Sequence, residues 1–286
     1  MLFLPIHTVS AQTTLVPREL KWKMCDTNSP ATVVVFPTTE NETLTTFDLR
    51  TWLALQYHWW NCPDRQARAA IPVSLTDLGA TMSRAGAKTG RIYLEGSLRR
   101  LSEVRLDWVN SFRSTDSSAD TGPIDVKSMT LLVETEDDSS QVGDRQVRVS
   151  RQPTLGYRFH ERIERNLIHG RTERLDFETA IRLRSELGLI LYTLLNGVLR
   201  HRRVWRRSGW NLIHEDLGLP TEYPRDAWIR HTLKIPVRAI DGKPLGTGTL
   251  DVSLEDDIGE ESAASILGGI KRKTNTTPKL IARRCD

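Results

Sequence analysis

Residues 74–104, SLTDLGATMSRAGAKTGRIYLEGSLRRLSEV, decide the fold class. Ser74 is a residue type that caps helices, and the LTDLGATM after it predicts a short helix. Gly86 and Gly90 mark a turn. The next helix starts at Arg91 and carries apolar residues at helical spacing, namely Ile92, Leu94, Leu98 and Leu101. Two helices joined by a tight glycine-containing turn form a helix-turn-helix, which leaves the second helix exposed on the surface.

The sequence around this motif completes the order of a winged helix-turn-helix. Upstream, we expect a strand at 31–36 and a helix at 43–62 that Thr45 or Thr46 caps and Pro63 ends. A brief strand, IPVS, is expected just before the short helix, at 71–74. Downstream, strands are expected at 104–112, 128–136 and 145–151, around a polar loop at 114–123.

The second half of the chain repeats this order of elements without repeating the residues. The predicted elements are a long core helix at 178–203, a short helix at 208–219 capped by Ser208 or Asn211, a helix at 220–240 that Pro236 disturbs, and a hairpin or wing at 242–257. Beyond residue 255 the sequence shows no periodicity, which predicts a flexible tail.

We therefore predict an α+β chain with two tandem winged helix-turn-helix domains. The predicted boundaries are an N-terminal extension at 1–30, a first domain at 31–150 for DNA binding and dimerisation, a second, main DNA-binding domain at 151–255, and a tail at 256–286.

The charge distribution favours a polyanionic partner more than the total does. The 286 residues carry a net charge of +4, but residues 151–250 alone hold 18 basic and 11 acidic side chains. Arg outnumbers Lys 31 to 9, and the planar guanidinium suits phosphates and guanine edges. Part of this excess would also follow from a GC-rich genome.

Several protein classes are disfavoured by the composition. Cys25, Cys62 and Cys285 fit neither a disulfide scaffold nor a zinc knuckle, and there is no long apolar run, so we expect a cytoplasmic chain without membrane contact. No His pair of a rolling-circle nuclease and no nucleotide-binding glycine loop occurs. We therefore expect no enzyme activity, no cofactor and no metal. The tryptophans lie mostly at apolar helical positions that predict core packing, including Trp228.

Six segments resemble bacterial plasmid replication initiator (Rep) proteins with tandem winged-helix domains. In the first half these are DLRTWLALQYHWW (48–60), VSLTDLGATM (73–82) and GRIYLEGSLRRLSEVRLDW (90–108). In the second half they are RLDFETAIRLRSELGLILYTLL (174–195), SGWNLIHEDLGL (208–219) and WIRHTLKIPVRAID (228–241). The resemblance covers roughly residues 40–255, in order.

The resemblance implies a plasmid replication initiator that binds double-stranded DNA at repeated origin sites (iterons). It also implies that the chain helps to open the origin, recruits a host initiator and the replicative helicase, self-associates as monomer and dimer, and represses its own promoter. A tandem winged-helix transcriptional repressor without a replication role is the alternative. A DNA-nicking or rejoining enzyme that uses Tyr192 or Tyr223 is a third hypothesis.

The predicted DNA-binding residues lie in three groups. Those around the first turn and its second helix are Arg84, Lys88, Arg91, Ser97, Arg99 and Arg100; the last two are adjacent, so they cannot both face one groove. The run RHRRVWRR at 200–207 contributes Arg203, Arg206 and Arg207, either as a phosphate clamp or as compensation of a helix end. The second recognition helix and its approach contribute Thr221, Tyr223, Arg225, Arg230, His231, Lys234 and Arg238.

Overall fold

The computed structural model describes residues 17–23, 30–63, 70–71, 73–83, 90–112, 124–135, 155–169, 175–199, 202–217, 219, 226–256 and 278–285. The chain forms two units that divide between Glu173 and Arg174. We call them the N-terminal and C-terminal units. Strand β6 (Tyr157–Phe159) and helix α5 (Glu161–Ile168) belong to the first of them, so the N-terminal unit extends beyond the boundary predicted at residue 150.

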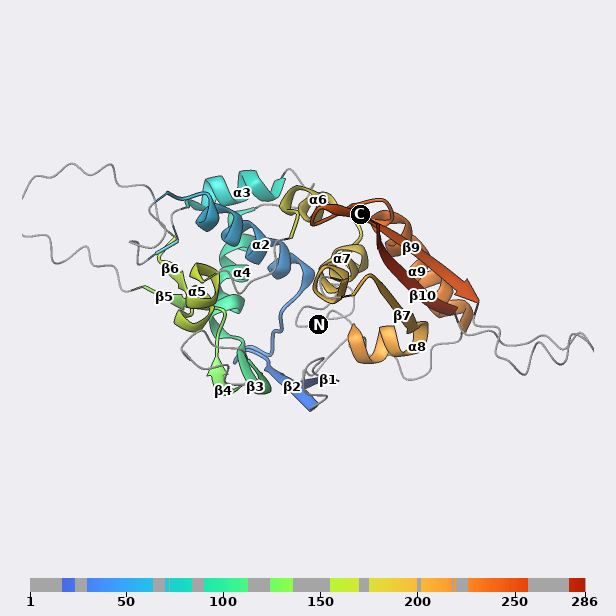
Figure 1. Cartoon of the computed structure of the whole chain (residues 1–286). Helices are drawn as coiled ribbons and strands as arrows, with labels where there is room; N and C mark the ends of the chain where they lie inside the picture. The colour runs from blue at the N-terminus through green and yellow to red at the C-terminus, as the bar shows by residue number, and fades with distance from the viewer. Residues whose placement is uncertain are drawn as a thin grey trace, which may run out of the picture. The chain divides into compact units, whose positions relative to one another are not determined.

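The elements of the N-terminal unit are β1 (Arg18–Lys23), β2 (Pro30–Phe36), α2 (Thr46–Trp60), α3 (Leu75–Ser83), α4 (Arg91–Glu103), β3 (Arg105–Phe112), β4 (Ile124–Met129), β5 (Leu132–Glu134), β6 and α5. Helices α2, α3 and α4 lie together, and strands β1 to β4 lie at one end of this group (Figure 1). Strands β1 to β4 form one antiparallel sheet in sequence order, and β5 pairs with β6.

Helices α2, α3 and α4 pack against one another through leucines and a small polar contact. Thr45 caps α2 in a capping box with Asp48, and Ser74 caps α3 by accepting from the Asp77 amide at 3.0 Å. At the centre, the buried Ser97 hydroxyl donates to the Thr51 hydroxyl at 2.9 Å. The two helices predicted on either side of the glycine turn are therefore present as α3 and α4, and both contact α2.

The C-terminal unit places helices against one face of a four-stranded antiparallel sheet (Figure 1). Its elements are α6 (Phe177–Arg182), α7 (Glu186–Leu199), β7 (Val204–Ser208), α8 (Gly209–Asn211), η3 (Leu212–Asp216), α9 (Asp226–Ile240), β8 (Pro244–Leu245), β9 (Gly248–Asp256) and β10 (Pro278–Cys285). The sheet order is β7-β10-β9-β8. Helices α7 and α9 contact each other and strands β9 and β10, and they form the core with the sheet.

Both units share one arrangement of elements. In each unit a helix, a segment that is not helical, a short helix and a second helix follow one another, and the last strand of the unit lies beside that segment. In the C-terminal unit this last strand is β10, between β7 and β9. In the N-terminal unit it is β6, which pairs with β5. The carbonyl oxygen of Tyr157 in β6 accepts a hydrogen bond from the Ile71 amide at 2.8 Å.

The structure corrects several sequence predictions in the N-terminal unit. Residues 71, 73 and 74 are not a strand, and the strand predicted at 128–136 is divided at Thr130 and Leu131 between two sheets. Residues 18–23 belong to the main sheet and not to a separate extension. The predicted loop at 114–123 and the strand at 145–151 lie outside the described residues.

Three findings concern the predictions for the C-terminal unit. The predicted long helix is interrupted at Leu183–Ser185, where the Ser185 hydroxyl accepts from the Gly188 amide and caps α7. Pro236 does not end α9, because the helix continues through it to Ile240. The hairpin predicted at 242–257 is confirmed as β8 and β9.

The largest error is the predicted flexible tail. Its last residues form β10, the strand between β7 and β9, where Leu280 and Ala282 are fully buried.

Candidate nucleic-acid interface

Helix α9 presents a cationic stripe to solvent on the side opposite its core contacts. His231, Lys234 and Arg238 are exposed and recur at intervals of three and four residues, so they lie along one face of the helix. Within the described residues none of the three makes an ion pair or a hydrogen bond with another side chain. The stripe therefore offers positive charge that no described residue neutralises.

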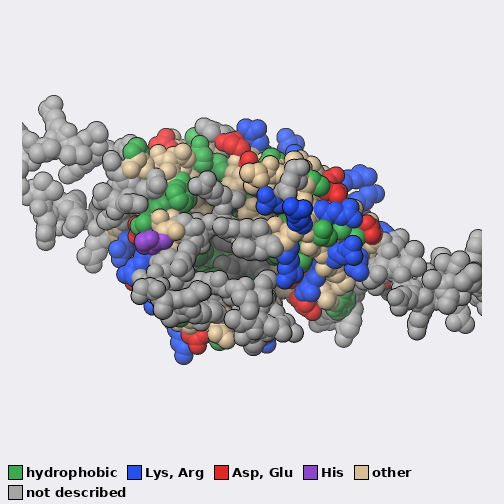
Figure 2. Space-filling model, in the orientation of Figure 1, with side chains coloured by type: hydrophobic (Ala, Val, Ile, Leu, Met, Phe, Trp, Pro, Cys, Tyr) green, Lys and Arg blue, Asp and Glu red, His purple; other side chains and the backbone are tan. Residues whose placement is uncertain are grey.

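The opposite face of α9 is buried and fixes the rotation of the helix. This face consists of Ile229, Leu233, Pro236, Val237 and Ile240. Because α9 contacts α7 and β9 through this face, the cationic stripe must point away from the core. In Figure 2, Lys and Arg side chains (blue) gather over the part of the surface that the C-terminal unit forms.

Gly209 lets the short helix approach α9 closely. A Cβ atom at this position would lie 2.5 Å from Ile229 Cγ2 and 2.9 Å from the carbonyl oxygen of Pro278. Such distances do not occur between real atoms, so only glycine fits here without a shift of α9 or β10. Ser208 precedes it and caps α8 by accepting from the Asn211 amide at 3.2 Å.

Arg207 is held by acidic side chains of the short helical segment η3. Its Nε donates to Asp216 Oδ2 at 2.6 Å, and its Nη2 bonds Glu215 Oε2 at 2.5 Å. Burial raises the pKa of the Asp216 carboxyl above its ordinary value, while the hydrogen bonds and charge of Arg207 oppose that rise. The prediction of DNA contact by Arg207 is therefore replaced by a role in joining β7 to η3.

The other described residues of the basic run at 200–207 lie in strand β7 and just before it. Helix α7 ends at Leu199 and β7 begins at Val204, so Arg206 cannot compensate a helix end. Arg206 is exposed on the face of β7 opposite Arg207. Arg203 is also exposed, and its carbonyl accepts from the Arg284 amide at 3.0 Å.

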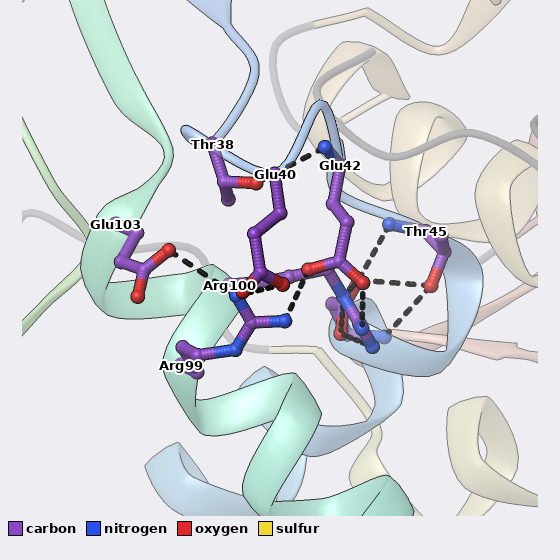
Figure 3. A network of polar contacts seen from close by, with 8 residues as sticks. Thr38, Glu40, Glu42, Thr45, Arg99, Arg100 and Glu103 are labelled. Carbon is purple, nitrogen blue, oxygen red and sulfur yellow. Dashed lines mark hydrogen bonds and ion pairs between the residues drawn. The ribbon is translucent and has the colours of Figure 1, made fainter. Parts of the chain in front are cut away.

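In the N-terminal unit, the two arginines predicted on the second helix both turn toward acids in the segment just before α2 (Figure 3). Arg99 bonds Glu42 at 2.5 Å and Glu40 at 2.8 Å, and it lies 3.5 Å from Glu103 on its own helix. Arg100 reaches the other oxygen of Glu42 at 3.4 Å. Adjacent positions thus converge on one carboxylate, which contradicts the expectation that they diverge.

Asp48 is the buried centre of this network. Its carboxylate has no exposed area and accepts bonds from Arg100 Nη2 at 2.9 Å and from Thr45, whose amide lies 2.7 Å away. Burial alone would lower the pKa of the Arg100 guanidinium, but the hydrogen bonds and charge of Asp48 outweigh it, so the pKa is raised. The pair fastens α4 to α2.

The structure therefore assigns the N-terminal candidates mostly to internal contacts. Arg91 is exposed but bonds Glu95 at 2.7 Å on its own helix. The prediction for Ser97 is wrong, because the side chain is fully buried against Thr51. Arg99 and Arg100 are committed to acids, as described above. Arg84, Lys88, Thr221, Tyr223 and Arg225 lie outside the described residues.

Two exposed apolar side chains beside the cationic stripe of α9 were missed from the sequence. Ile235 is 64% exposed, and Trp228, which the sequence predicts as core, is 39% exposed. If the buried positions of α9 define the side that faces the core, both residues lie on the opposite side, where the cationic stripe lies. Arg230 lies at the edge of the stripe and is partly exposed.

Tyr192 is placed unfavourably for the nucleophilic role considered above. Its ring is fully buried, and its hydroxyl donates to the Pro244 carbonyl oxygen at 2.5 Å. Burial raises the pKa of this hydroxyl far above its ordinary value, so the phenolate is disfavoured. Tyr192 fastens α7 to the β8–β9 hairpin, and Tyr223 is outside the described residues.

The described part of the chain contains neither a cluster of potential metal ligands nor a membrane-spanning helix. There, no three His, Cys, Asp or Glu side chains gather as a bound metal ion requires, and His58 Nε2 lies 2.8 Å from the Thr81 hydroxyl. No helix within the same ranges is long and apolar enough to cross a bilayer.

The fold is similar to that of RctB domains 2 and 3. One crystal structure, of RctB residues 155–483, aligns with a TM-score of 0.56 at 12% identity, covering 99% of this chain and 95% of that one. A selenomethionine crystal structure of the same two domains gives a TM-score of 0.54 at 14% identity, with 99% and 94% covered. No family model and no curated protein matches the sequence. At such low identity the likeness concerns the fold alone.

Proposed function

We propose that the chain is a sequence-specific DNA-binding protein that initiates replication at repeated origin sites. In this proposal each unit is a winged helix. Helices α3 and α4 form the helix-turn-helix of the N-terminal unit, and α8, η3 and α9 form that of the C-terminal unit. Helix α9 enters the major groove, which is wide enough for an α-helix.

The observation that carries the proposal is the stripe of His231, Lys234 and Arg238 on α9. A helix that is fixed by its buried face and carries unneutralised cations on the other is the arrangement with which recognition helices meet phosphates and base edges. Because no described carboxylate pairs with Lys234 or Arg238, their charge is available to a polyanion.

The replication role rests on two further supports. The sequence resembles plasmid replication initiators over both halves, and the likeness to RctB supports a replication-initiator fold without singling out the plasmid family. Iteron binding, self-association, promoter repression and recruitment of a host initiator and helicase are parts of the same proposal. No residue is assigned a catalytic role.

Two experiments test the proposal in order. First, the full chain is used to enrich duplexes from a random-sequence library, and binding of the enriched duplex is measured by fluorescence anisotropy. We expect one preferred sequence and an affinity that falls steeply with salt. Failure to enrich any sequence would remove the proposed DNA-binding function.

Second, the gene and its flanking DNA are placed on a plasmid that has no other origin. We expect the plasmid to replicate, and the Lys234→Ala, Arg238→Ala double variant to abolish replication. A chain that binds the enriched duplex and lowers transcription from its promoter, but never supports replication, would favour the repressor.

A further inference from the structure

The large hydrophobic side chains that the described structure exposes most are two isoleucines, one on the second helix of each helix-turn-helix pair. Ile92 on α4 is 82% exposed and Ile235 on α9 is 64% exposed, while Tyr93 follows at 56%. A β-branched residue at a solvent-facing helical position lowers helix propensity and gains no packing in return. Contact with a partner would supply that packing.

Ile235 lies at the edge of the cationic stripe of α9. His231 is four residues before it, Lys234 is its neighbour, and Arg238 is three residues after it. On a helix His231 and Arg238 lie on the same face as Ile235, and Lys234 lies on the other side of them, so the apolar group borders side chains that suit phosphates or base edges. This charge complementarity favours DNA over an apolar protein surface as the occupant.

We propose that Ile235 contacts the 5-methyl group of a thymine in the major groove and so selects for thymine at one position of the binding site. This inference rests on the proposed DNA-binding function. The thymine methyl is the apolar group that the major groove displays, and it distinguishes thymine from cytosine by contact without a hydrogen bond. In this proposal Lys234 and Arg238 contribute affinity for the duplex, and Ile235 contributes the preference for thymine.

Ile92 is a matched control, because its surroundings differ. Beside it, Arg91 is bonded to Glu95, and further along α4 the cations are paired with Glu40, Glu42 and Asp48. The exposed isoleucine of α4 therefore lacks unneutralised cations on its own helix. Replacement of Ile92 by Ala should leave the methyl dependence described next unchanged.

The test uses the duplex that the full chain enriches from a random library. Each thymine is replaced in turn by deoxyuridine, which lacks only the 5-methyl group, and dissociation constants are measured for the wild type, Ile235→Ala and Ile92→Ala. We expect one thymine whose replacement weakens wild-type binding about fourfold, as for removal of one buried methyl. At that position Ile235→Ala should bind thymine and deoxyuridine equally, whereas Ile92→Ala should keep the preference.

The outcomes separate the two proposals. If no duplex is enriched, the DNA-binding function itself is wrong. If a duplex is bound but no deoxyuridine replacement affects the wild type, or if Ile235→Ala retains the full methyl preference, the role of Ile235 is wrong while DNA binding stands. Because Ile235 is exposed and Ala has the higher helix propensity, the variant should fold, and circular dichroism checks this.

Discussion

Helices α4 and α9 occupy equivalent places in the two units, but their positive charge is used differently. On α4, Arg91, Arg99 and Arg100 all bond carboxylates of the same unit. On α9, Lys234 and Arg238 pair with no described residue. The two helices would look alike if judged by their basic residues alone.

The difference shows that a basic residue in the sequence is not the same as charge available to a ligand. Guanidinium groups that hold a helix in place are partly buried and neutralised, so they contribute to stability and little to the external field. We therefore expect the variants of α4 to affect folding and those of α9 to affect binding.

The largest effect is expected for Asp48→Ala in the N-terminal unit. Removal of this carboxylate leaves the half-buried Arg100 without its main partner, and loss of one partner of a buried ion pair costs about 3–5 kcal/mol of unfolding free energy. Urea denaturation measures it. Asp77→Ala is the control, because Asp77 makes an exposed bond to Ser74 and its loss should cost about 1 kcal/mol or less. Equal losses in the two variants would contradict the role of the Asp48–Arg100 pair in fastening α4 to α2.

Lys234→Ala on α9 should show the opposite behaviour. We expect binding to the enriched duplex to weaken by about 1–3 kcal/mol, with the urea midpoint unchanged, because the side chain is exposed and makes no hydrogen bond or ion pair with a described residue. The control is Arg91→Ala, an exposed cation already paired with Glu95, which should leave binding unchanged. Comparable losses for both would erase the distinction between α4 and α9.

Alanine in place of two helical glycines tests the packing beneath each second helix. Gly209→Ala should lower the unfolding free energy by about 1–3 kcal/mol, because the new Cβ meets Ile229 and Pro278. Gly96→Ala on α4 should raise it by about 0.5–1 kcal/mol, because only ordinary contact with Arg100 is added and helix propensity improves. Thermal unfolding gives both signs, and destabilisation by Gly96→Ala would be unexpected.

The smallest effects concern the caps of the first helix in each pair. Ser74→Ala and Ser208→Ala each remove one hydrogen bond to a helix amide, and each should cost about 1 kcal/mol of unfolding free energy. Only Ser208→Ala should also weaken DNA binding, because α8 packs against α9. An equal effect of Ser74→Ala on binding would show that α4 also contacts the duplex.

Local signals in the sequence located most of the helices. Thr45, Ser74 and Ser208 are residue types that predict caps and serve as caps, and the apolar spacing of α9 separates its buried face from its exposed face. The same periodicity is sufficient to identify His231, Lys234 and Arg238 as one stripe. Ile235 could also have been found in this way, since it falls out of phase with Leu233 and Val237.

Contacts distant in sequence could not be predicted. Arg99 and Arg100 find carboxylates in the segment before and within α2, more than fifty residues away, and nothing near them in the sequence signals this. Strand β10 was missed because its short apolar run follows a long aperiodic segment, and its pairing with β7 and β9 exists only in the folded unit.

The central claim is that the DNA-binding charge lies on α9 and not on α4. It is tested most directly by the salt dependence of binding to the enriched duplex. For Lys234→Ala with Arg238→Ala, the slope of log K against log salt should decrease in magnitude by about 0.9 for each phosphate that is no longer neutralised, whereas Arg91→Ala with Arg99→Ala should leave it unchanged. A slope that changes for the α4 pair and not for the α9 pair would contradict the account.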